Sequence, residues 1–254
     1  MIVLKSPREI EKMRAAGKIV AEVLERLKPL AKPGVTTEEF DSLAERIVKK
    51  YDAIAGFKGY RDYPASICTS VNEEVVHGIP GKRVLKNGDI ISLDFGAVYQ
   101  GMYADAALTL PVGEASAEAR RLIAVAERSL REGIFKATAN NRIGDISFAI
   151  QSAVEKNNYS VVRDYAGHGV GRELHEDPQI PNFGKPGTGP RIKIGMTLAL
   201  EPMINMGGYQ VKVLKDNWTV ITADRLYSAH CEHTVWITDN GPEILTPWSW
   251  VVQE

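Results

Sequence analysis

Apolar residues recur every three or four positions in four stretches of the chain, a spacing typical of helices that bury one face. The first stretch follows the capping box Ser6–Glu9, with Pro7 at the first helical position, and places Ile10, Met13 and Leu27 on one face. Proline and glycine residues interrupt the pattern between the stretches. The pattern predicts helices over Pro7–Lys28, from Thr36 to about Tyr51, from Ser116 to about Thr138, and from the cap Asp145 to about Asn158.

A different pattern lies between the second and third helices, where two runs of Val, Ile, Leu and aromatic residues meet at Gln100-Gly101. Two such runs around a short turn predict a β-hairpin. A Tyr99-Gln100 loop sets Asp94 opposite Asp105, whereas a Gln100-Gly101 loop sets Asp105 diagonal to Asp94 on the same face. Either register brings the two carboxylates together. Their repulsion requires a bound cation or a raised pKa, unless both acids face water on a solvated edge.

The second pair of helices repeats the first. Residues 35–51 align with residues 143–159 at an offset of 108, and residues 85–95 align with residues 192–202 at an offset of 107. The second alignment sets Glu201 at the place of Asp94, so a pseudo-twofold molecule would bring both acids to one central site. The sequence therefore predicts an α+β fold in which duplicated helix-helix-sheet halves share one core. We expect a single domain over 1–254, with halves of about 1–110 and 111–254.

Three further residues belong with the paired aspartates. His168 lies in AGHGVGRELHEDP, Glu201 ends the strand-like run MTLALEP, and Glu232 lies in SAHCEHTVWIT. Together with Asp94 and Asp105 they form a set of four carboxylates and one imidazole, which suits two divalent ions with bridging carboxylates. The four negative charges equal the charge of two such ions, which leaves a neutral His168 free to ligate.

Composition narrows the function classes. The formal net charge of −1 and the pI of about 6.5 give no basic surface for non-specific binding of nucleic acid. No run is long and apolar enough for a membrane span, and the first residues lack the apolar core of a signal peptide. We therefore expect a cytoplasmic protein without nucleic-acid or membrane partners. Its two cysteines, Cys68 and Cys231, fit reduced thiols better than a disulfide framework.

Seven stretches give the chain a family likeness. In chain order they are KSPREIEKMRAAG, KPGVTTEEFD, CTSVNEEVVHGIP, LDFGAVYQGMYADAALT, GHGVGRELHEDP, MTLALEPMIN and EHTV. With these motifs the sequence resembles the type I methionine aminopeptidases of the pita-bread fold along nearly its whole length. The spacing between the last motifs leaves no room for the insertion of the type II enzymes, so the chain is similar to the short bacterial form. The resemblance implies a central curved antiparallel sheet around two metal ions.

The resemblance also implies the roles of single residues at the metals. Asp94 would ligate one ion, His168 and Glu201 the other, and Asp105 and Glu232 both. The ions would be Co, Mn, Fe or Zn, and water activated between them would be the nucleophile. The acidic limb of activity would report metal-bound water and protonation of the ligands, including His168, because a protonated imidazole cannot ligate. Activity would fall below about pH 6, near the ordinary His pKa of ~6.5.

Around the metals, the resemblance implies residues that act on the substrate. Glu201 would also move the proton of the nucleophile, His175 would stabilise the oxyanion, and His77 would contact the scissile amide nitrogen. A methionine-sized pocket would be lined by Tyr60, Tyr63, Cys68 and Trp218.

Three positions depart from the family's pattern. Phe57 and Leu174 stand where Cys and Phe are usual, and Cys231 stands where a bulkier residue is common. Strand parity turns Cys231 away from the face of Glu232. His230 shares that face, so it lies either beside a metal ligand or in an ordinary core or surface position; His233 does not share it.

The expected function is the removal of the initiator methionine from nascent chains whose second residue is small. The expected partners are nascent N-termini and, transiently, the ribosome, and the expected oligomeric state is a monomer. Two alternatives remain open from the sequence. One is a proline-specific aminopeptidase or prolidase, which shares the fold and the ligand pattern, and the other is a non-catalytic pita-bread module that binds peptides.

Overall fold

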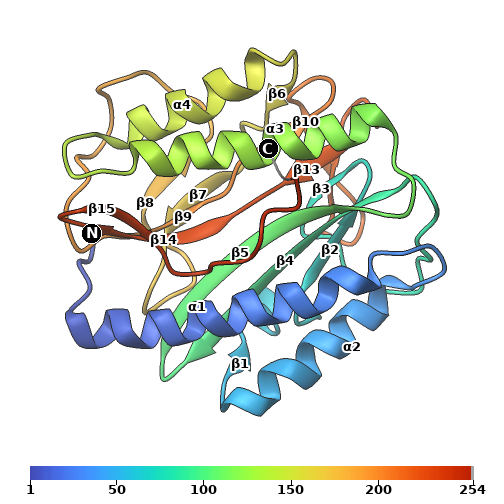
Figure 1. Ribbon diagram of the computed structural model, residues 1–254, viewed down its shortest axis with the longest axis horizontal. Coiled ribbons are helices and arrows are strands. Elements are labelled where there is room, and N and C mark those ends of the chain that lie inside the picture. The colour runs from blue at the N-terminus through green and yellow to red at the C-terminus, as the bar shows by residue number, and fades with distance from the viewer. Residues whose placement is uncertain (253–254) are drawn as a thin grey trace.

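Two pairs of helices cover one side of an antiparallel β framework in the computed structural model, which describes residues 1–252 (Figure 1). The four predicted helices are present. The helices are α1 (Pro7–Leu27), α2 (Thr37–Val48), α3 (Ala117–Lys136) and α4 (Ile143–Glu155), with single 3-10 turns η1 (Lys28–Leu30), η2 (Lys49–Tyr51) and η3 (Tyr60–Asp62).

The helix starts follow the predicted capping chemistry, except in α4. Ser6 and Glu9 form the capping box of α1, and Ser116 Oγ accepts the amide of Ala119 at the start of α3. In α4 the helix begins two residues before the predicted cap. Asp145 is its third residue and accepts the Arg142 N–H through Oδ2 at 2.7 Å, which is the acidic half of a capping box.

All the strand pairings are antiparallel among residues 1–252. The strands of the predicted α+β fold form four hydrogen-bonded sheets: β1-β4-β2 with β5 on β4, β13-β10-β6, β11-β12-β3, and β15-β14-β9-β7-β8. The strands are β1 (Ile54–Ala55), β2 (Cys68–Val71), β3 (Glu74–Val76), β4 (Ile90–Tyr99), β5 (Met102–Pro111), β6 (Ser160–Val161), β7 (Ala166–Gly169), β8 (Glu176–Pro181), β9 (Thr197–Leu200), β10 (Met203–Asn205), β11 (Val211–Val213), β12 (Val220–Thr222), β13 (Ser228–His230), β14 (His233–Thr238) and β15 (Gly241–Ile244).

The β4-β5 hairpin has the Gln100-Gly101 loop, which sets Asp94 opposite Ala107. Both loop residues have positive φ, 47° at Gln100 and 79° at Gly101, as a two-residue hairpin turn of type I′ requires. The alternative register, with Asp94 directly opposite Asp105, is wrong. Asp105 lies diagonal to Asp94 on the same face of the sheet.

The two halves repeat their hydrogen bonds, at offsets that differ from one prediction. An isolated bridge precedes the second helix of each pair, Thr36 to Val84 in one half and Arg142 to Arg191 in the other. Thr36 and Arg142, which precede the two helices, are 106 residues apart, and their bridge partners Val84 and Arg191 are 107 residues apart. The offset of 108 for the helices is therefore wrong, because it aligns the fully buried Phe40 with Phe148, which is 45% exposed.

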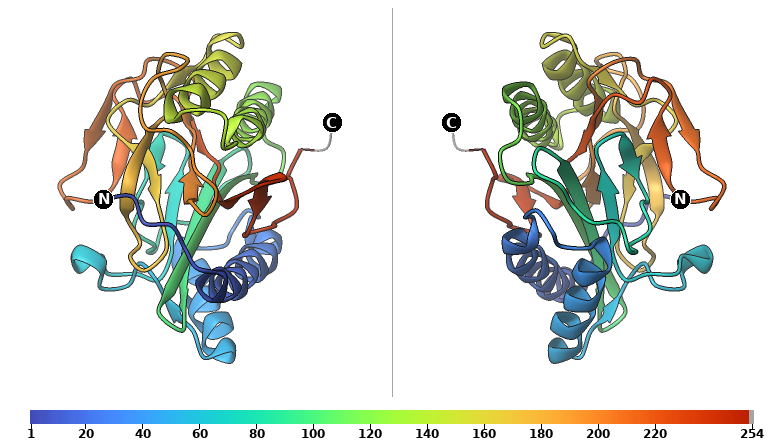
Figure 2. Two further views of the ribbon diagram at one scale, coloured as in Figure 1. Left: turned by 90° about the vertical axis from the view of Figure 1, so that its left-hand side faces the viewer. Right: turned by 90° about the vertical axis from the view of Figure 1, so that its right-hand side faces the viewer.

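The helices pack on the outer side of the sheets, and the acids lie on the other side. Helix α1 packs against β4 and β5, and α3 packs against β13 and β5. Figure 2 shows all four helices on one side of the strands and the loop with η3 on the opposite side. The sheets of the two halves meet where Glu232 N–H donates to Ala107 C=O at 2.8 Å. Within residues 1–252, no helix has the length and apolar content that crossing a membrane requires.

Candidate metal centre

Neighbouring strands bring the first acids together. Cys68 of β2 lies opposite Asp94 of β4, so the side chains of both residues stand on the face that also carries Asp105. Glu232 reaches this face from the turn between β13 and β14, where its own N–H bonds to β5. Residues far apart in the sequence therefore converge at one point because the strands of the two halves adjoin there.

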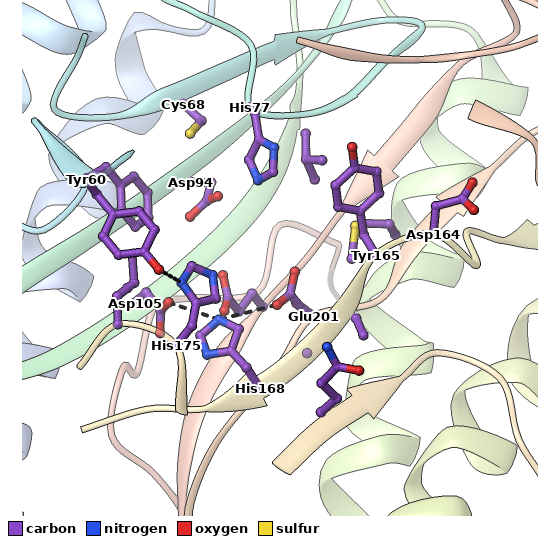
Figure 3. Close-up of a pocket in the computed structure, with 18 of the residues that line it drawn as sticks. Tyr60, Cys68, His77, Asp94, Asp105, Asp164, Tyr165, His168, His175 and Glu201 are labelled. Atoms are coloured by element: carbon purple, nitrogen blue, oxygen red, sulfur yellow. Dashed lines mark hydrogen bonds and ion pairs between the residues drawn. The ribbon is translucent and has the colours of Figure 1, made fainter. Parts of the chain in front are cut away.

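One cavity of about 640 Å³ contains the whole predicted site (Figure 3). Its lining includes every residue expected to bind metal or substrate: Tyr60, Tyr63, Cys68, His77, Asp94, Asp105, His168, His175, Glu201, Trp218 and Glu232. Phe57 and Leu174, two of the departures from the family's pattern, also line it.

Three of the expected ligands form a compact group. One ligand atom from each of Asp105, His168 and Glu232 lies within 4.8 Å of the other two, and all three side chains are buried. Glu201 adjoins them, with Oε1 at 3.5 Å from His168 Nε2. Asp105 Oδ2 lies 3.6 Å from the same nitrogen. Dashed lines in Figure 3 mark both contacts of His168. The ligand atoms thus surround a space of the size that a metal ion fills.

The four carboxyl groups are strained electrostatically without a cation. Burial raises the pKa of Asp105 to about 6, and burial together with neighbouring carboxylates raises the pKa values of Asp94, Glu201 and Glu232 well above the ordinary range. Asp94 Oδ1 is also buried without a hydrogen-bond partner. Buried carboxylates in native proteins are paired or coordinate metals, so this donor set fits divalent ions.

His168 is prepared to ligate through one nitrogen. Its Nδ1 lies 2.9 Å from the Gly169 carbonyl oxygen, to which only an Nδ1–H can donate, so Nε2 carries the free lone pair. That nitrogen is the one that faces Asp105 and Glu201. Burial lowers the pKa of His168 to about 4, which keeps the imidazole neutral at pH 7.

Two more histidines flank the ligand group. The His175 ring lies 4.3 Å from the His168 ring, and its Nδ1 is 2.8 Å from the Tyr60 hydroxyl oxygen. His77 has the unusual φ of 60° and packs edge-on against Tyr165. Burial lowers the pKa of both His77 and His175 to about 4. Both rings therefore enter the cavity as neutral hydrogen-bonding groups.

An aromatic wall lies beside the acids. Tyr63 packs edge-on against Trp218 at 5.0 Å, and its hydroxyl reaches the Gly78 carbonyl at 3.0 Å. Phe57 covers Gly96, where an added Cβ would lie only 2.7 Å from the ring, so a side chain at this position of β4 would displace Phe57. Leu174 belongs to the same apolar cluster as Phe57 and Tyr63. The wall is therefore tightly packed at its base and apolar.

The structure defines the surroundings of Cys231, His230 and His233. Cys231 lies in the main core and outside the cavity lining, as strand parity predicted, and both cysteines are free. His230 is buried beside Glu201, with Nε2 at 3.8 Å from Oε2. His233 stacks on Trp248 at 4.5 Å and bonds to Thr246 in the core.

Sequence reasoning missed several residues at this site. Asp164 and Tyr165 line the cavity just before the His168 segment, and Glu176 lines it just after His175. The sequence could have indicated them only because they lie close to His168 and His175 along the chain. Thr234, which bonds to Asp105, lies two residues after Glu232 and gave no signal of its own.

Comparisons with known proteins agree with this geometry. The sequence model of metallopeptidase family M24 matches residues 11–239. A methionine aminopeptidase of Clostridium acetobutylicum is 57% identical over 97% of this chain and 99% of its own length. The crystal structure of the Thermotoga maritima methionine aminopeptidase superposes with a TM-score of 0.96 at 51% identity, covering 97% of this chain and 99% of that one. The prolidase of Pyrococcus furiosus shares the fold at a TM-score of 0.77 and 21% identity, and this chain covers 66% of it.

Proposed function

The chain belongs to metallopeptidase family M24, among its type I methionine aminopeptidases of the pita-bread fold, and from this premise we propose how its residues remove an initiator methionine. The observation that carries the proposal is the buried group of Asp105, His168 and Glu232, joined by Glu201 and Asp94. We propose that the whole chain works as one catalytic domain, because one core cluster contains residues from both halves.

Five side chains would hold two divalent ions. Asp94 would ligate one ion, His168 and Glu201 the other, and Asp105 and Glu232 would bridge them. Co, Mn, Fe and Zn all suit such a set, and availability decides among them. When bound, the ions supply Lewis-acid chemistry, which polarises the substrate carbonyl and lowers the pKa of water.

The remaining residues of the cavity would handle the substrate and its protons. Glu201 would take the proton of the attacking water and pass it to the leaving amine. His175 would donate from Nε2 to the oxyanion, in the tautomer in which the Tyr60 hydroxyl donates to Nδ1. His77, on the other side of the cavity, would contact the nitrogen of the scissile amide.

The aromatic wall would bind the methionine side chain. Tyr60, Tyr63, Cys68 and Trp218 offer rings and a thiol to a flexible thioether. These rings crowd the space around the scissile bond, which favours a small second residue. The substrates would be nascent chains with a free N-terminal methionine, and we propose that a cytoplasmic monomer meets them transiently at the ribosome.

The two alternative functions have less support. The prolidase of Pyrococcus furiosus shares the fold at 21% identity, which is a likeness of fold only, whereas near full-length relatives at 54% to 57% identity are methionine aminopeptidases. A non-catalytic binding module would have no use for four buried carboxylates that repel one another. All five residues expected to bind metal are present in this chain and line the cavity.

Peptide hydrolysis tests the proposal directly. The protein is freed of metal with a chelator, checked by elemental analysis, and assayed on Met-Ala-Ser and on an Ala-Pro peptide before and after Mn²⁺ is restored. We expect cleavage of Met-Ala-Ser only with metal present, and release of free methionine. Preferential cleavage of the Ala-Pro peptide would favour the prolidase alternative, and full activity in metal-free protein would refute the metal mechanism.

A further inference from the structure

The segment before α1 lies along the loop that carries His175. This loop connects β7 to β8, and Figure 2 shows the N-terminal segment passing beside β8 on its way to α1. The backbone of the segment is fixed there, since Lys5 N–H donates to the Gly195 carbonyl at 3.0 Å. The two segments are distant in sequence, so their contact is a tertiary feature.

A buried ion pair joins the segment to the loop. Lys5 Nζ lies 2.5 Å from Glu176 Oε2, and the two side chains are only 1% and 9% exposed. The other oxygen of Glu176 accepts the backbone N–H of Arg172 at 2.7 Å and that of Glu173 at 3.3 Å. The Glu176 carboxylate therefore links the loop backbone at Arg172 and Glu173 to the Lys5 side chain.

The fit between Lys5 and the loop is close. A Cβ added to Gly171 would lie 2.1 Å from Lys5 Cε, so the lysine stem occupies the place of a side chain at that position. A second ion pair, from Arg172 Nε to Glu9 Oε1 at 2.7 Å, is solvent-exposed on the arginine side and contributes little. The buried pair is thus the main charged link between the segment and the loop.

We propose that Lys5 is a positioning residue of the active site: through Glu176 it holds the loop that presents His175 to the substrate. Glu176 follows His175 directly and lines the same cavity. Without Lys5, the buried carboxylate would lose its counter-charge and turn toward the water of the cavity, and the neighbouring imidazole would move with it. The inference rests on the proposed function, because it takes His175 to act on the reacting carbonyl.

The test is a double-mutant cycle between Lys5→Met and His175→Ala in the metal-loaded protein. Methionine keeps the stem of lysine and removes its charge. If Lys5 acts through His175, Lys5→Met should lower kcat about 10-fold with little change in KM, since misplacement by about 1 Å can cost up to ~100-fold. In the His175→Ala background the same change should leave kcat unaltered.

A matched control separates positioning from general stability. Arg14 of α1, the helix that follows Lys5, makes a two-point ion pair with Glu243 of β15, away from the cavity. Arg14→Met should lower the melting temperature without changing kcat. If Lys5→Met does not fold, Glu176→Gln tests the same link, because it keeps the hydrogen-bonding oxygen and removes the charge.

The outcomes separate the positioning role of Lys5 from the proposed role of His175 on the reacting carbonyl. Equal losses of kcat from Lys5→Met in both backgrounds, or no loss in either, would overturn the positioning role. If His175→Ala alone leaves kcat intact, the proposed role of His175 fails. A ring ¹⁵N spectrum adds a readout that stability does not move: the His175 signals should shift in Lys5→Met and stay unchanged in Arg14→Met.

Discussion

Thr234 lies directly behind Asp105, with its Oγ1 at 3.1 Å from the Asp105 amide nitrogen and 3.0 Å from the Asp105 Oδ1. Both residues are buried, and β14 supplies the threonine while β5 supplies the aspartate. The hydroxyl accepts from the backbone N–H of Asp105, and its proton lies within reach of both the Asp105 carbonyl oxygen, at 2.9 Å, and the carboxylate Oδ1. It is therefore placed to orient the carboxylate proposed to bridge the metals.

Removing this hydroxyl should weaken metal binding. Thr234→Val keeps the shape of the side chain, and we expect affinity for Mn²⁺ to fall about 10- to 100-fold, as is usual when a partner of a ligand is lost. Calorimetric titration of the metal-free protein measures it. Thr238→Val on the same strand is the matched control, because the Thr238 hydroxyl bonds to Gly241 at the hairpin turn. Equal losses in both variants would contradict the role of Thr234.

Loss of a bridging ligand should cost more than a change in the pocket. We expect Asp105→Asn or Glu232→Gln to lower kcat/KM by more than the roughly 100-fold typical of residues behind the ligands. Cys68→Ala removes only pocket volume and should cost about 10-fold or less. Steady-state assays on Met-Ala-Ser at saturating Mn²⁺ measure all three. A larger loss in Cys68→Ala than in the ligand variants would argue against the ligand assignment.

Metal binding should release protons and weaken at acidic pH. The raised pKa values of the carboxyl groups, about 6 for Asp105, mean that the metal-free site holds protons that a cation must displace. Affinity for Mn²⁺ should therefore fall by about 10-fold per pH unit for each proton displaced as the pH is lowered from 8 to 5. Titrations in two buffers of different ionisation enthalpy count the protons.

Among the ligands expected to take up protons in the acidic limb of activity, the carboxyl groups are favoured over His168. Burial places the pKa of His168 at about 4, below the ordinary value on which the sequence-based expectation rested. The carboxyl groups, rather than the imidazole, take up protons as the pH falls through 6. Binding of Mn²⁺ that is independent of pH from 6 to 8, without proton release, would contradict this assignment.

His233 should make the fold less stable in acid. Burial lowers its pKa to about 3, so between pH 6.5 and 3 the unfolded chain takes up a proton that the folded chain refuses, and stability falls as the pH falls. From pH 8 to pH 5 this amounts to about 2 kcal/mol. Urea unfolding of metal-free wild type and His233→Gln at both pH values should show a smaller loss in the variant by that amount. An identical pH dependence in the two proteins would exclude His233 as the source.

Phe57 and Leu174 should determine selectivity together. Both belong to the cluster that forms the pocket wall, so Leu174→Phe alone would overpack it and slow cleavage of Met-Ala peptides. Adding Phe57→Cys should relieve the crowding and restore the rate.

We expect wild type to cleave Met-Ala, Met-Gly and Met-Ser well and Met-Lys or Met-Phe poorly, in a peptide series with a varied second residue. Equal kcat/KM for Met-Ala and Met-Lys would refute the size rule.

The sequence by itself determined the features that depend on neighbouring residues. Helical spacing and N-cap residues predicted α1 and α3 with ends correct to a few residues, because backbone caps and buried faces are local. Strand alternation placed Asp94 and Asp105 on one face in either register. Residue chemistry predicted the ligand set, since four carboxylates and one imidazole suit two divalent ions.

Only the tertiary structure decided features that join distant segments. The hairpin register followed from the positive φ of Gln100 and Gly101, and the helix offset of 106 followed from hydrogen bonds across each half. The pKa of His168 depended on how deeply the fold buries it. The contacts of Thr234 with Asp105 and of Lys5 with Glu176 span 129 and 171 residues. No local pattern encodes such pairs, because burial and partner are set only when the strands of both halves close around the same cavity.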